Sequence, residues 1–297
     1  MKLTFLGTGT SHGVPVIACD CKVCKSKNKK DKRTRSAAYL QIQDKNNTNK
    51  YILIDIGPDF REQALRENIR QIDAVLLTHA HADHLHGIDD LRNFSCIMSN
   101  KPDNPQSKKY ERPPIPIFTN QFTVNDVKSR FSYLFSEKAD GGGHAKITMN
   151  SVEHKFEFSN IQITPIPMMH GTLQTFGWLL TEKNKNNSLE NKSIAYLTDC
   201  NCISDEAIAL IKNNCGNLVH LIIDGLRIKE HSTHFNFLQA LEIAGRISAE
   251  HIWLTHLTHN SSHAQTIKYL KAHREDFSTL KTVKTILPAY DGLVIEC

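Results

Sequence analysis

One stretch of the chain constrains its fold and chemistry more than any other: residues 76–87 read Leu-Leu-Thr-His-Ala-His-Ala-Asp-His-Leu-His-Gly. The preceding residues 72–78 are apolar and rich in β-branched side chains, which is typical of a buried strand. Residues 83–91 favour a helix, and Asp83 near its start suits the positive end of the helix dipole. The sequence therefore predicts a strand, a turn dense in histidine, and a helix.

The polar residues of this turn are spaced to face one region. His79 and His81 lie two apart in an extended segment, so their side chains point the same way. Asp83 and His84 follow where the chain enters the helix, and they bring a second pair toward the same space. Imidazoles combined with a carboxylate suit zinc, manganese or iron. A histidine-rich surface turn is the alternative, but this spacing between a strand and a helix favours a metal site for two ions.

Composition limits the class of protein. The chain has 297 residues, 40% of them hydrophobic, which suffices for one large domain or two smaller ones. The net charge of +5 only mildly favours anionic partners. No stretch is apolar enough to span a bilayer, and the first residues resemble a strand rather than a signal peptide. Eight cysteines without an export signal predict the reducing cytoplasm, where clustered thiols hold metal more often than they form disulfides.

A second group of ligand-type residues lies near the start of the chain. Cys19, Cys21 and Cys24 form a C-x-C-x-x-C pattern that supplies three thiolates at ligand spacing. A structural zinc needs four ligands, so a fourth must come from elsewhere; three unrelated free cysteines are the alternative. The basic residues 25–35 are typical of a solvated loop, although they would also help to keep the thiols ionised.

Further candidate ligands stand at the ends of predicted strands. They are His170 after residues 161–167, Asp199 after residues 193–198, and His256 after residues 251–255. A carboxylate such as Asp199 has two oxygens and can bridge two ions. Taken singly, His170 can be read as a loop histidine and Asp199 as a helix cap. Together, such readings would require the same coincidence at four separate strand ends. Asp55, at the end of residues 51–55, either orients a metal-bound histidine or caps a turn.

The rest of the pattern alternates strands with helices. Further strands are predicted at residues 2–6, 37–42, 115–119, 152–158, 176–181 and 218–224, and helices at 59–68, 123–135, 234–247, 261–273 and from near Ser204. Residues 99–116 are predicted to form a surface insertion, and residues 136–145 a flexible loop over the site. Cys200 and Cys202 are expected to be buried packing residues.

The motif His79-x-His81-x-Asp83-His84, with the later His170, Asp199 and His256, resembles the metallo-β-lactamase superfamily of metal hydrolases over essentially the whole chain. The resemblance implies a four-layer αβ/βα sandwich and therefore a single α/β domain over residues 1–297. It also implies a ligand set for each of two ions. The first ion would take His79, His81 and His170; the second would take Asp83, His84 and His256; Asp199 would bridge both.

A narrower similarity comes from residues 7–15, Gly-Thr-Gly-Thr-Ser-His-Gly-Val-Pro, and from the cysteine trio. These resemble the cyclic-phosphodiesterase branch, typified by the phosphodiesterase of the carbon–phosphorus lyase pathway. In that branch a structural zinc is held by the three cysteines and a histidine three residues after the last catalytic one, which His259 matches here. The branch also has a catalytic histidine at the start of the penultimate helix, which His234 matches by position.

The resemblance implies a phosphodiesterase that acts on a small, cyclic, anionic phosphodiester. A hydroxide bridging two divalent ions (zinc, manganese or iron) would attack phosphorus. Asp83 or Asp199 would orient this nucleophile, and His234 would protonate the leaving oxygen or grip the phosphate. The Cys19, Cys21, Cys24 and His259 zinc would fix one wall of the site without reacting.

Three rival functions stay open. A tRNA-processing ribonuclease shares the metal motif, although no long basic arm for gripping RNA is evident in the sequence. The same metals can hydrolyse thioesters or lactones, and a non-catalytic metal-binding protein could keep the fold. No membrane partner is expected, nucleic acid is less favoured than a small substrate, and a homodimer stays open.

Overall fold

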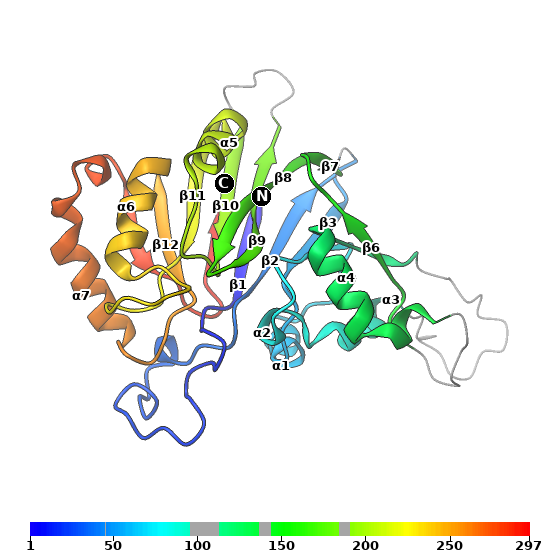
Figure 1. Cartoon of the computed structure of the whole chain (residues 1–297), viewed down its shortest axis with the longest axis horizontal. Helices are drawn as coiled ribbons and strands as arrows, with labels where there is room; N and C mark the ends of the chain where they lie inside the picture. The colour runs from blue at the N-terminus through cyan, green and yellow to red at the C-terminus, as the bar shows by residue number, and fades with distance from the viewer. Residues whose placement is uncertain (45, 96–112, 137–143, 184–190) are drawn as a thin grey trace.

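The computed structural model describes residues 1–44, 46–95, 113–136, 144–183 and 191–297. Within these residues the strands form two seven-stranded sheets. The first has the order β14-β1-β2-β3-β4-β5-β6 and the second β13-β12-β11-β10-β9-β8-β7. The two sheets lie face to face, with α1 to α4 outside the first and α5 to α7 outside the second (Figure 1). This is the four-layer αβ/βα sandwich that the sequence predicts.

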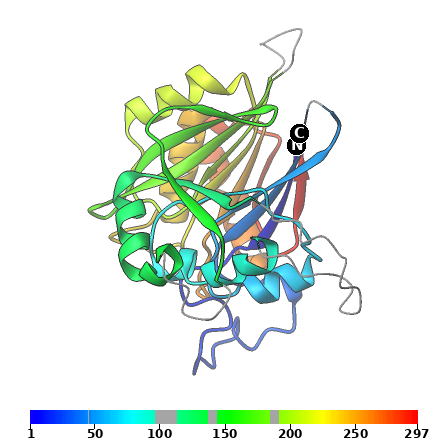
Figure 2. The same ribbon diagram turned by 90° about the vertical axis from the view of Figure 1, so that its right-hand side faces the viewer.

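The first sheet is built mainly from the first half of the chain. Its strands are β1 (Lys2–Gly7), β2 (Ala37–Gln43), β3 (Asn49–Ile54), β4 (Ala74–Leu76), β5 (Ile115–Thr119), β6 (Ile147–Ser151) and β14 (Val294–Glu296). Its helices are α1 (Phe60–Arg66), α2 (Ala82–Leu85), α3 (Arg92–Ser95) and α4 (Gln121–Arg130), with short 3-10 turns η1 (Lys29–Asp31), η2 (Ile88–Leu91) and η3 (Ser132–Phe135). Figure 2 looks onto this side of the molecule, with the cyan and blue-green helices in front.

The second sheet takes up the other half. Its strands are β7 (Phe156–Phe158), β8 (Ile161–His170), β9 (Leu173–Glu182), β10 (Lys192–Leu197), β11 (Asn217–Asp224), β12 (His251–Thr255) and β13 (Thr285–Pro288). Its helices are α5 (Asp205–Cys215), α6 (Phe237–Ile247) and α7 (His263–His273), followed by the 3-10 turns η5 (Arg274–Asp276) and η6 (Ser278–Leu280). Among the described residues, the helices lack the combined length and apolar character needed to cross a membrane.

Alternate residues of the central strands face different cores, which explains their nearly continuous apolar character. In β3, Ile52 and Ile54 join the core between the two sheets, whereas Leu53 joins the core under α1 and α4. In the second sheet, Tyr196 faces the core between the sheets and Leu197 the core under α5 to α7. Both sheets are therefore buried on both faces, so polar residues collect at the strand ends.

Several predicted elements differ in their bounds. The helix predicted at 83–91 is broken into α2 and η2, because the chain at Gly87 packs against the end of β3. The Gly87 N–H donates to the Ile56 carbonyl at 2.9 Å, and a Cβ at Gly87 would lie 2.2 Å from the Gly57 carbonyl oxygen. This close approach prevents a continuous helix. In the same way, the helix predicted at 123–135 ends at Arg130 and continues only as η3.

The helix predicted from His234 begins later, at Phe237. Asn236 is its N-cap: its side chain accepts from the Gln239 N–H, and the Gln239 side chain accepts from the Asn236 N–H. His234 therefore precedes the helix, and the prediction that it lies at the helix N-terminus is wrong. Strand 72–78 is also shorter than predicted, and β6 was not predicted as a separate strand.

Two predicted loops fall largely outside the described residues. Most of the predicted insertion at 99–116 lies there, although Ile115 and Pro116 belong to β5. Residues 137–143 of the loop predicted at 136–145 also lie outside them.

Candidate metal centre and its second cluster

The polar strand ends meet at one edge of the sandwich. β3, β4 and β5 run parallel in the first sheet, and β10, β11 and β12 run parallel in the second, so their carboxyl ends gather together. Seven predicted ligands lie at this edge, and we refer to them as the His/Asp cluster: His79, His81, Asp83, His84, His170, Asp199 and His256. Residues that are far apart in the sequence, from both sheets, thus come together in one cluster.

The turn after β4 is held tightly against β3. A Cβ at Gly57 would lie 1.9 Å from the carbonyl oxygen of Asp83, so only glycine allows this approach. The Ile56 N–H also donates to the His84 carbonyl at 2.7 Å. These contacts fix the backbone of Asp83 and His84 and hence the direction of their side chains.

Three histidines form the more open part of the cluster. Ligand-type atoms of His79, His81 and His170 all lie within 4.8 Å of one another. His79 is buried, whereas His81 is exposed. The cluster is therefore open to solvent on the side on which His81 lies.

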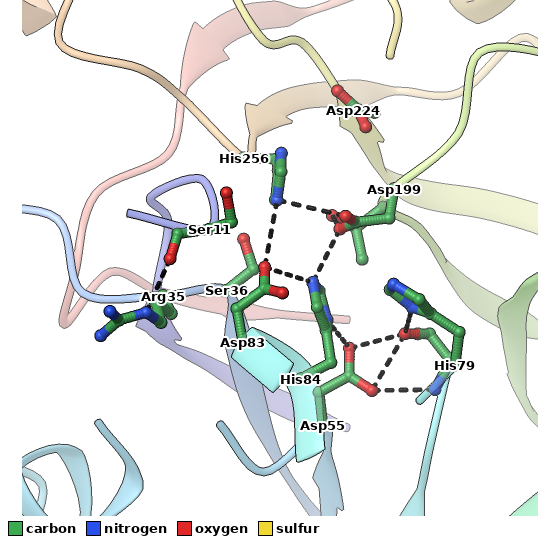
Figure 3. Close-up of polar contacts among 12 residues, drawn as sticks. Ser11, Arg35, Ser36, Asp55, His79, Asp83, His84, Asp199, Asp224 and His256 are labelled. Carbon is green, nitrogen blue, oxygen red and sulfur yellow. Dashed lines mark hydrogen bonds and ion pairs between the residues drawn. The ribbon is translucent and has the colours of Figure 1, made fainter. Parts of the chain in front are cut away.

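The other part of the cluster is buried and richer in carboxylates (Figure 3). Nε2 of His84 lies 3.0 Å from Oδ2 of Asp199 and 3.2 Å from Oδ2 of Asp83. Nε2 of His256 lies 3.2 Å from Oδ1 of Asp199. The two oxygens of Asp199 thus face different histidines, which is the arrangement a bridging carboxylate needs.

Ionised carboxylates in the buried part of the cluster stabilise positive charge on the groups beside them. Burial alone would lower the pKa of His84, but the Asp199, Asp83 and Asp55 carboxylates around it raise that pKa well above its usual value. Burial would likewise raise the pKa of Asp199, yet His256 and His84 hold it well below its ordinary range. The carboxylates stay ionised, so the cluster presents negative charge toward whatever occupies its centre.

The donor set fits divalent cations. Within the described residues, the buried Nε2 atoms of His79, His84 and His256 make no hydrogen bond, although they lie among ionised carboxylates. A buried nitrogen that makes no hydrogen bond is costly unless it binds something. Imidazole and carboxylate ligands at this spacing suit zinc, manganese or iron.

In three histidines of the cluster, a contact made by Nδ1 fixes the direction in which Nε2 points. Nδ1 of His84 donates to Oδ2 of Asp55 at 2.7 Å, and Nδ1 of His79 lies 2.9 Å from the Thr78 hydroxyl, which itself bonds to Asp55. Nδ1 of His170 donates to the Thr233 carbonyl at 2.7 Å. Such bonds fix the tautomer and turn Nε2 toward a metal. Of the two roles open to Asp55 in the sequence, the structure therefore favours orienting a histidine.

Backbone strain also gathers here. Asp55, Asp199 and His256 each come directly after a strand, and each has a positive φ angle, of 61°, 55° and 59° respectively. A non-glycine residue in this left-handed region costs about 1–3 kcal/mol and persists only where the surrounding structure holds it there. These turns come directly after buried strands and direct the three side chains toward the cluster.

His234 adjoins the cluster through its own carboxylate partner. Nδ1 of His234 donates to Oδ2 of Asp224 at 2.7 Å, and its ring lies 4.5 Å from that of His170 and 4.6 Å from that of His256. Asp224 also accepts from the Cys200 N–H at 3.1 Å. Sequence analysis placed Asp224 only as the last residue of a strand. Its position at the same edge as Asp199, on the next parallel strand, was the signal that would have identified it.

The second predicted cluster also comes together. We refer to Cys19, Cys21, Cys24 and His259 as the Cys/His cluster. Nδ1 of His259 lies 3.2, 3.5 and 3.4 Å from the sulfurs of Cys19, Cys21 and Cys24. A tetrahedral zinc with ordinary bond lengths separates a sulfur and a nitrogen ligand by about 3.6 Å. The spacing therefore fits one ion with four protein ligands.

The thiols of this cluster differ in acidity. The Cys24 N–H, 3.4 Å from the sulfur of Cys21, is the main cause that lowers the pKa of Cys21 to about 6. Burial raises the pKa of Cys24 to about 11. The thiolate of Cys21 is thus available at neutral pH, whereas a cation must displace the proton of Cys24.

Outside the cluster, Cys200 is buried as predicted, but Cys202 is exposed, so the packing role predicted for Cys202 is wrong.

The comparisons with known proteins agree with this geometry. Residues 50–257 match the family model described as "Beta-lactamase superfamily domain". The chain therefore belongs to the beta-lactamase superfamily, and the class of protein that its fold and His/Asp cluster define is a metal-dependent hydrolase.

Within this class, one protein that the chain resembles over its full length comes from the PhnP family. The crystal structure of a new diphosphatase from that family is 32% identical, has a TM-score of 0.74, and is matched over 100% of this chain and 97% of that chain. Zn²⁺-bound PqqB from Methylobacterium extorquens has a TM-score of 0.71 over 100% of both chains; at 17% identity, it shares the fold.

A curated relative carries a different name. The octanoyltransferase of Porphyromonas gingivalis (strain ATCC BAA-308 / W83) is 34% identical over 296 residues, which are 99% of this chain but 51% of that protein. The chain thus spans about half the length of this relative, and the name belongs to the whole of it.

Proposed function

We propose that this chain hydrolyses small phosphodiesters at the His/Asp cluster. The observation that carries the proposal is the buried Asp199, whose two oxygens face His84 and His256 while ligand-type atoms of His170, Asp199 and His234 also lie within 4.8 Å of one another. The two groups of candidate metal ligands therefore meet at Asp199, and His234, which is hydrogen-bonded to Asp224, lies beside them. The diphosphatase activity in the name of the PhnP-family relative is hydrolysis of a phosphoanhydride, which, like phosphodiester hydrolysis, is attack of water on phosphorus and supports the same broad reaction class.

The proposed ligands divide as the sequence motif divides. His79, His81 and His170 would hold one divalent ion; Asp83, His84 and His256 would hold the other; and Asp199 would face both. Such a pair supplies electrophilic stabilisation of phosphoryl oxygens and makes water a better nucleophile near neutral pH. In this proposal the ions are zinc, manganese or iron, and a further zinc occupies the Cys/His cluster.

The chain's own residues would do the rest. Asp83 and Asp199 are ionised acceptors that can orient an attacking water by hydrogen bonding. Because Asp224 accepts from Nδ1 of His234, Nε2 is the nitrogen left to face the ester; as the imidazolium, with both nitrogens protonated, the ring would give its Nε2 proton to the leaving oxygen and return to the neutral form. The same bond holds the ring beside His170 and His256, next to the place where the ester would lie.

A substrate panel on metal-loaded protein tests the reaction class. It comprises 2′,3′-cyclic AMP, bis-p-nitrophenyl phosphate, a nucleoside diphosphate ester, a thioester, a lactone and precursor tRNA. We expect hydrolysis of the small phosphoesters. Hydrolysis of only the thioester or lactone, or no hydrolysis with both ions bound, would contradict the proposal. Preferential, salt-sensitive cleavage of tRNA would instead identify a ribonuclease.

His234→Ala tests the proton donor. General acid catalysis contributes about 10²–10⁴-fold, so kcat should fall by about that factor while the metal content stays that of the wild type. His154→Ala, which replaces an exposed histidine away from the cluster, is the matched control and should leave kcat unchanged. If His234→Ala loses metal in proportion to activity, the residue is a ligand and not the proposed acid.

A further inference from the structure

The end of α4 lies against the segment that carries the histidine motif. Nη1 of Arg130, the last residue of the helix, donates to the Ala80 carbonyl at 2.7 Å. Ala80 is the residue between His79 and His81. Nη2 of the same guanidinium donates to Oδ2 of Asp126, one turn earlier in the helix, at 2.5 Å. The two bonds hold the head group between its own helix and the motif.

The residues that follow the helix contact the same segment further along. The ring of Phe131 lies 5.7 Å from that of His86, and the Tyr133 hydroxyl donates to Oδ2 of Asp89 at 2.6 Å. The end of α4 and the histidine segment are therefore packed together at more than the Arg130 contact.

The bond from Arg130 supports a part of the backbone that has little other support. The backbone of His79 and Ala80 makes no other hydrogen bond among the residues that the structure describes. Nδ1 of His79 lies 2.9 Å from the Thr78 hydroxyl, whereas the exposed ring of His81 makes no hydrogen bond within the described parts of the chain. The direction of the His81 ring therefore depends on the backbone that Arg130 holds.

The ligands proposed for the second ion are held without Arg130. The Ile56 N–H donates to the His84 carbonyl at 2.7 Å, and Nδ1 of His84 donates to Oδ2 of Asp55 at 2.7 Å. His256 follows β12, in the other sheet. Loss of the Arg130 bond should therefore disturb one ion of the cluster and not the other.

We propose that Arg130 is a positioning residue that sets the affinity of the first ion of the His/Asp cluster, the ion assigned to the three histidines of its more open part. A hydrogen bond from a charged donor is about twice as strong as one between neutral groups. Because Asp126 offsets the charge of the guanidinium, the head group acts on the motif through this bond. The inference rests on the ligand assignment of the proposed function.

Competition for zinc between metal-loaded protein and a chelator of known affinity tests the proposal without a substrate. The wild type should hold three ions, two in the His/Asp cluster and one in the Cys/His cluster. Arg130→Gln should weaken one of the three affinities by about 10–100-fold, as is typical when a group that orients metal ligands is lost, and leave the other two unchanged. Arg130→Lys keeps the charge but not the paired donors and should weaken the same affinity by a smaller factor. Lys128→Gln removes an exposed cation from the same helix and should change none of them.

Anomalous diffraction from Arg130→Gln crystals at limiting zinc identifies the affected ion. The weakened peak should be the one beside His79, His81 and His170. Equal affinities in Arg130→Gln and Lys128→Gln, or equal weakening of all three ions, would overturn the positioning role, whether or not the protein hydrolyses phosphodiesters. If the single affinity falls as expected but the wild type with both ions bound hydrolyses no phosphoester, the proposed function fails and the positioning role stands.

Discussion

The His/Asp cluster and the Cys/His cluster gather ligand-type residues in opposite ways. The first takes its side chains from the ends of strands in both sheets, and six of its members are buried or nearly so. The second joins a loop at residues 19–24 to the loop after β12, and three of its members are only half-buried. The sheets therefore hold the first cluster in place, whereas loop segments hold the second.

The two clusters nevertheless share one segment. His256 and His259 are three residues apart, and the buried Arg33 donates to the carbonyls of Thr258 and Ser261 on either side of His259. The loop between β12 and α7 is thus fastened from the Cys/His side while it presents His256 to the His/Asp side. The difference supports the proposal that one cluster carries the chemistry and the other holds that loop.

The largest effect is expected from Asp199→Asn. The change removes the charge that faces both His84 and His256, so at least one ion should be lost and kcat should fall by about a thousandfold or more. Metal analysis and hydrolysis of bis-p-nitrophenyl phosphate measure this. Asp205→Asn, an exposed aspartate nearby in sequence, is the control. Full activity in Asp199→Asn would remove the basis for a shared carboxylate.

Cys21→Ser should act on stability before chemistry. Loss of one of four ligands should release one zinc and lower the melting temperature by about 5–10 °C, because a structural metal contributes to folding directly. The two ions of the His/Asp cluster should stay bound. Cys202→Ser makes the same chemical change at an exposed cysteine outside both clusters and should do neither. Unchanged zinc content in Cys21→Ser would show that the Cys/His cluster is not a zinc site.

A smaller, pH-dependent effect is expected on the side of the Cys/His cluster. Burial, with Lys30 and Arg33 nearby, lowers the pKa of His263 to about 4, whereas the unfolded chain has a value of about 6.5. Below pH 6.5 the unfolded state takes up a proton that the folded state refuses, so His263 contributes stability above pH 6.5 that is lost as the pH falls toward 4.

Urea denaturation at pH 7 and pH 4.5 measures this loss. The buried His263 should account for about 1–2 kcal/mol of the decrease. The decrease should be smaller by that amount in His263→Gln. Identical decreases in the two proteins would contradict the assigned pKa.

Sequence patterns predicted the fold well where apolar runs end in polar residues. β5 and β12 have the predicted bounds, and His79, Asp199 and His256 follow strands as expected. Local periodicity failed where distant chain segments decide, as at Gly87, whose contact with Gly57 breaks a helix. A capping box moved the start of α6 past His234 for a local reason that the sequence did contain.

The site was predicted unevenly for a related reason. Ligand-type residues in a dense motif are conspicuous, and the structure brings all of them together. Asp224 has no motif around it. Its position beside the cluster appears only once its carboxylate meets Nδ1 of His234. Sequence alone does not show which lone polar residue the folded chain will place beside a cluster.

The most direct test of the account is anomalous X-ray diffraction from crystals of metal-loaded protein. The account predicts two peaks within the His/Asp cluster, one beside His79, His81 and His170 and one beside Asp83, His84 and His256, with Asp199 next to both. It also predicts a third peak, of zinc, inside the Cys/His cluster. Active protein whose metal lies only in the Cys/His cluster would contradict the central claim.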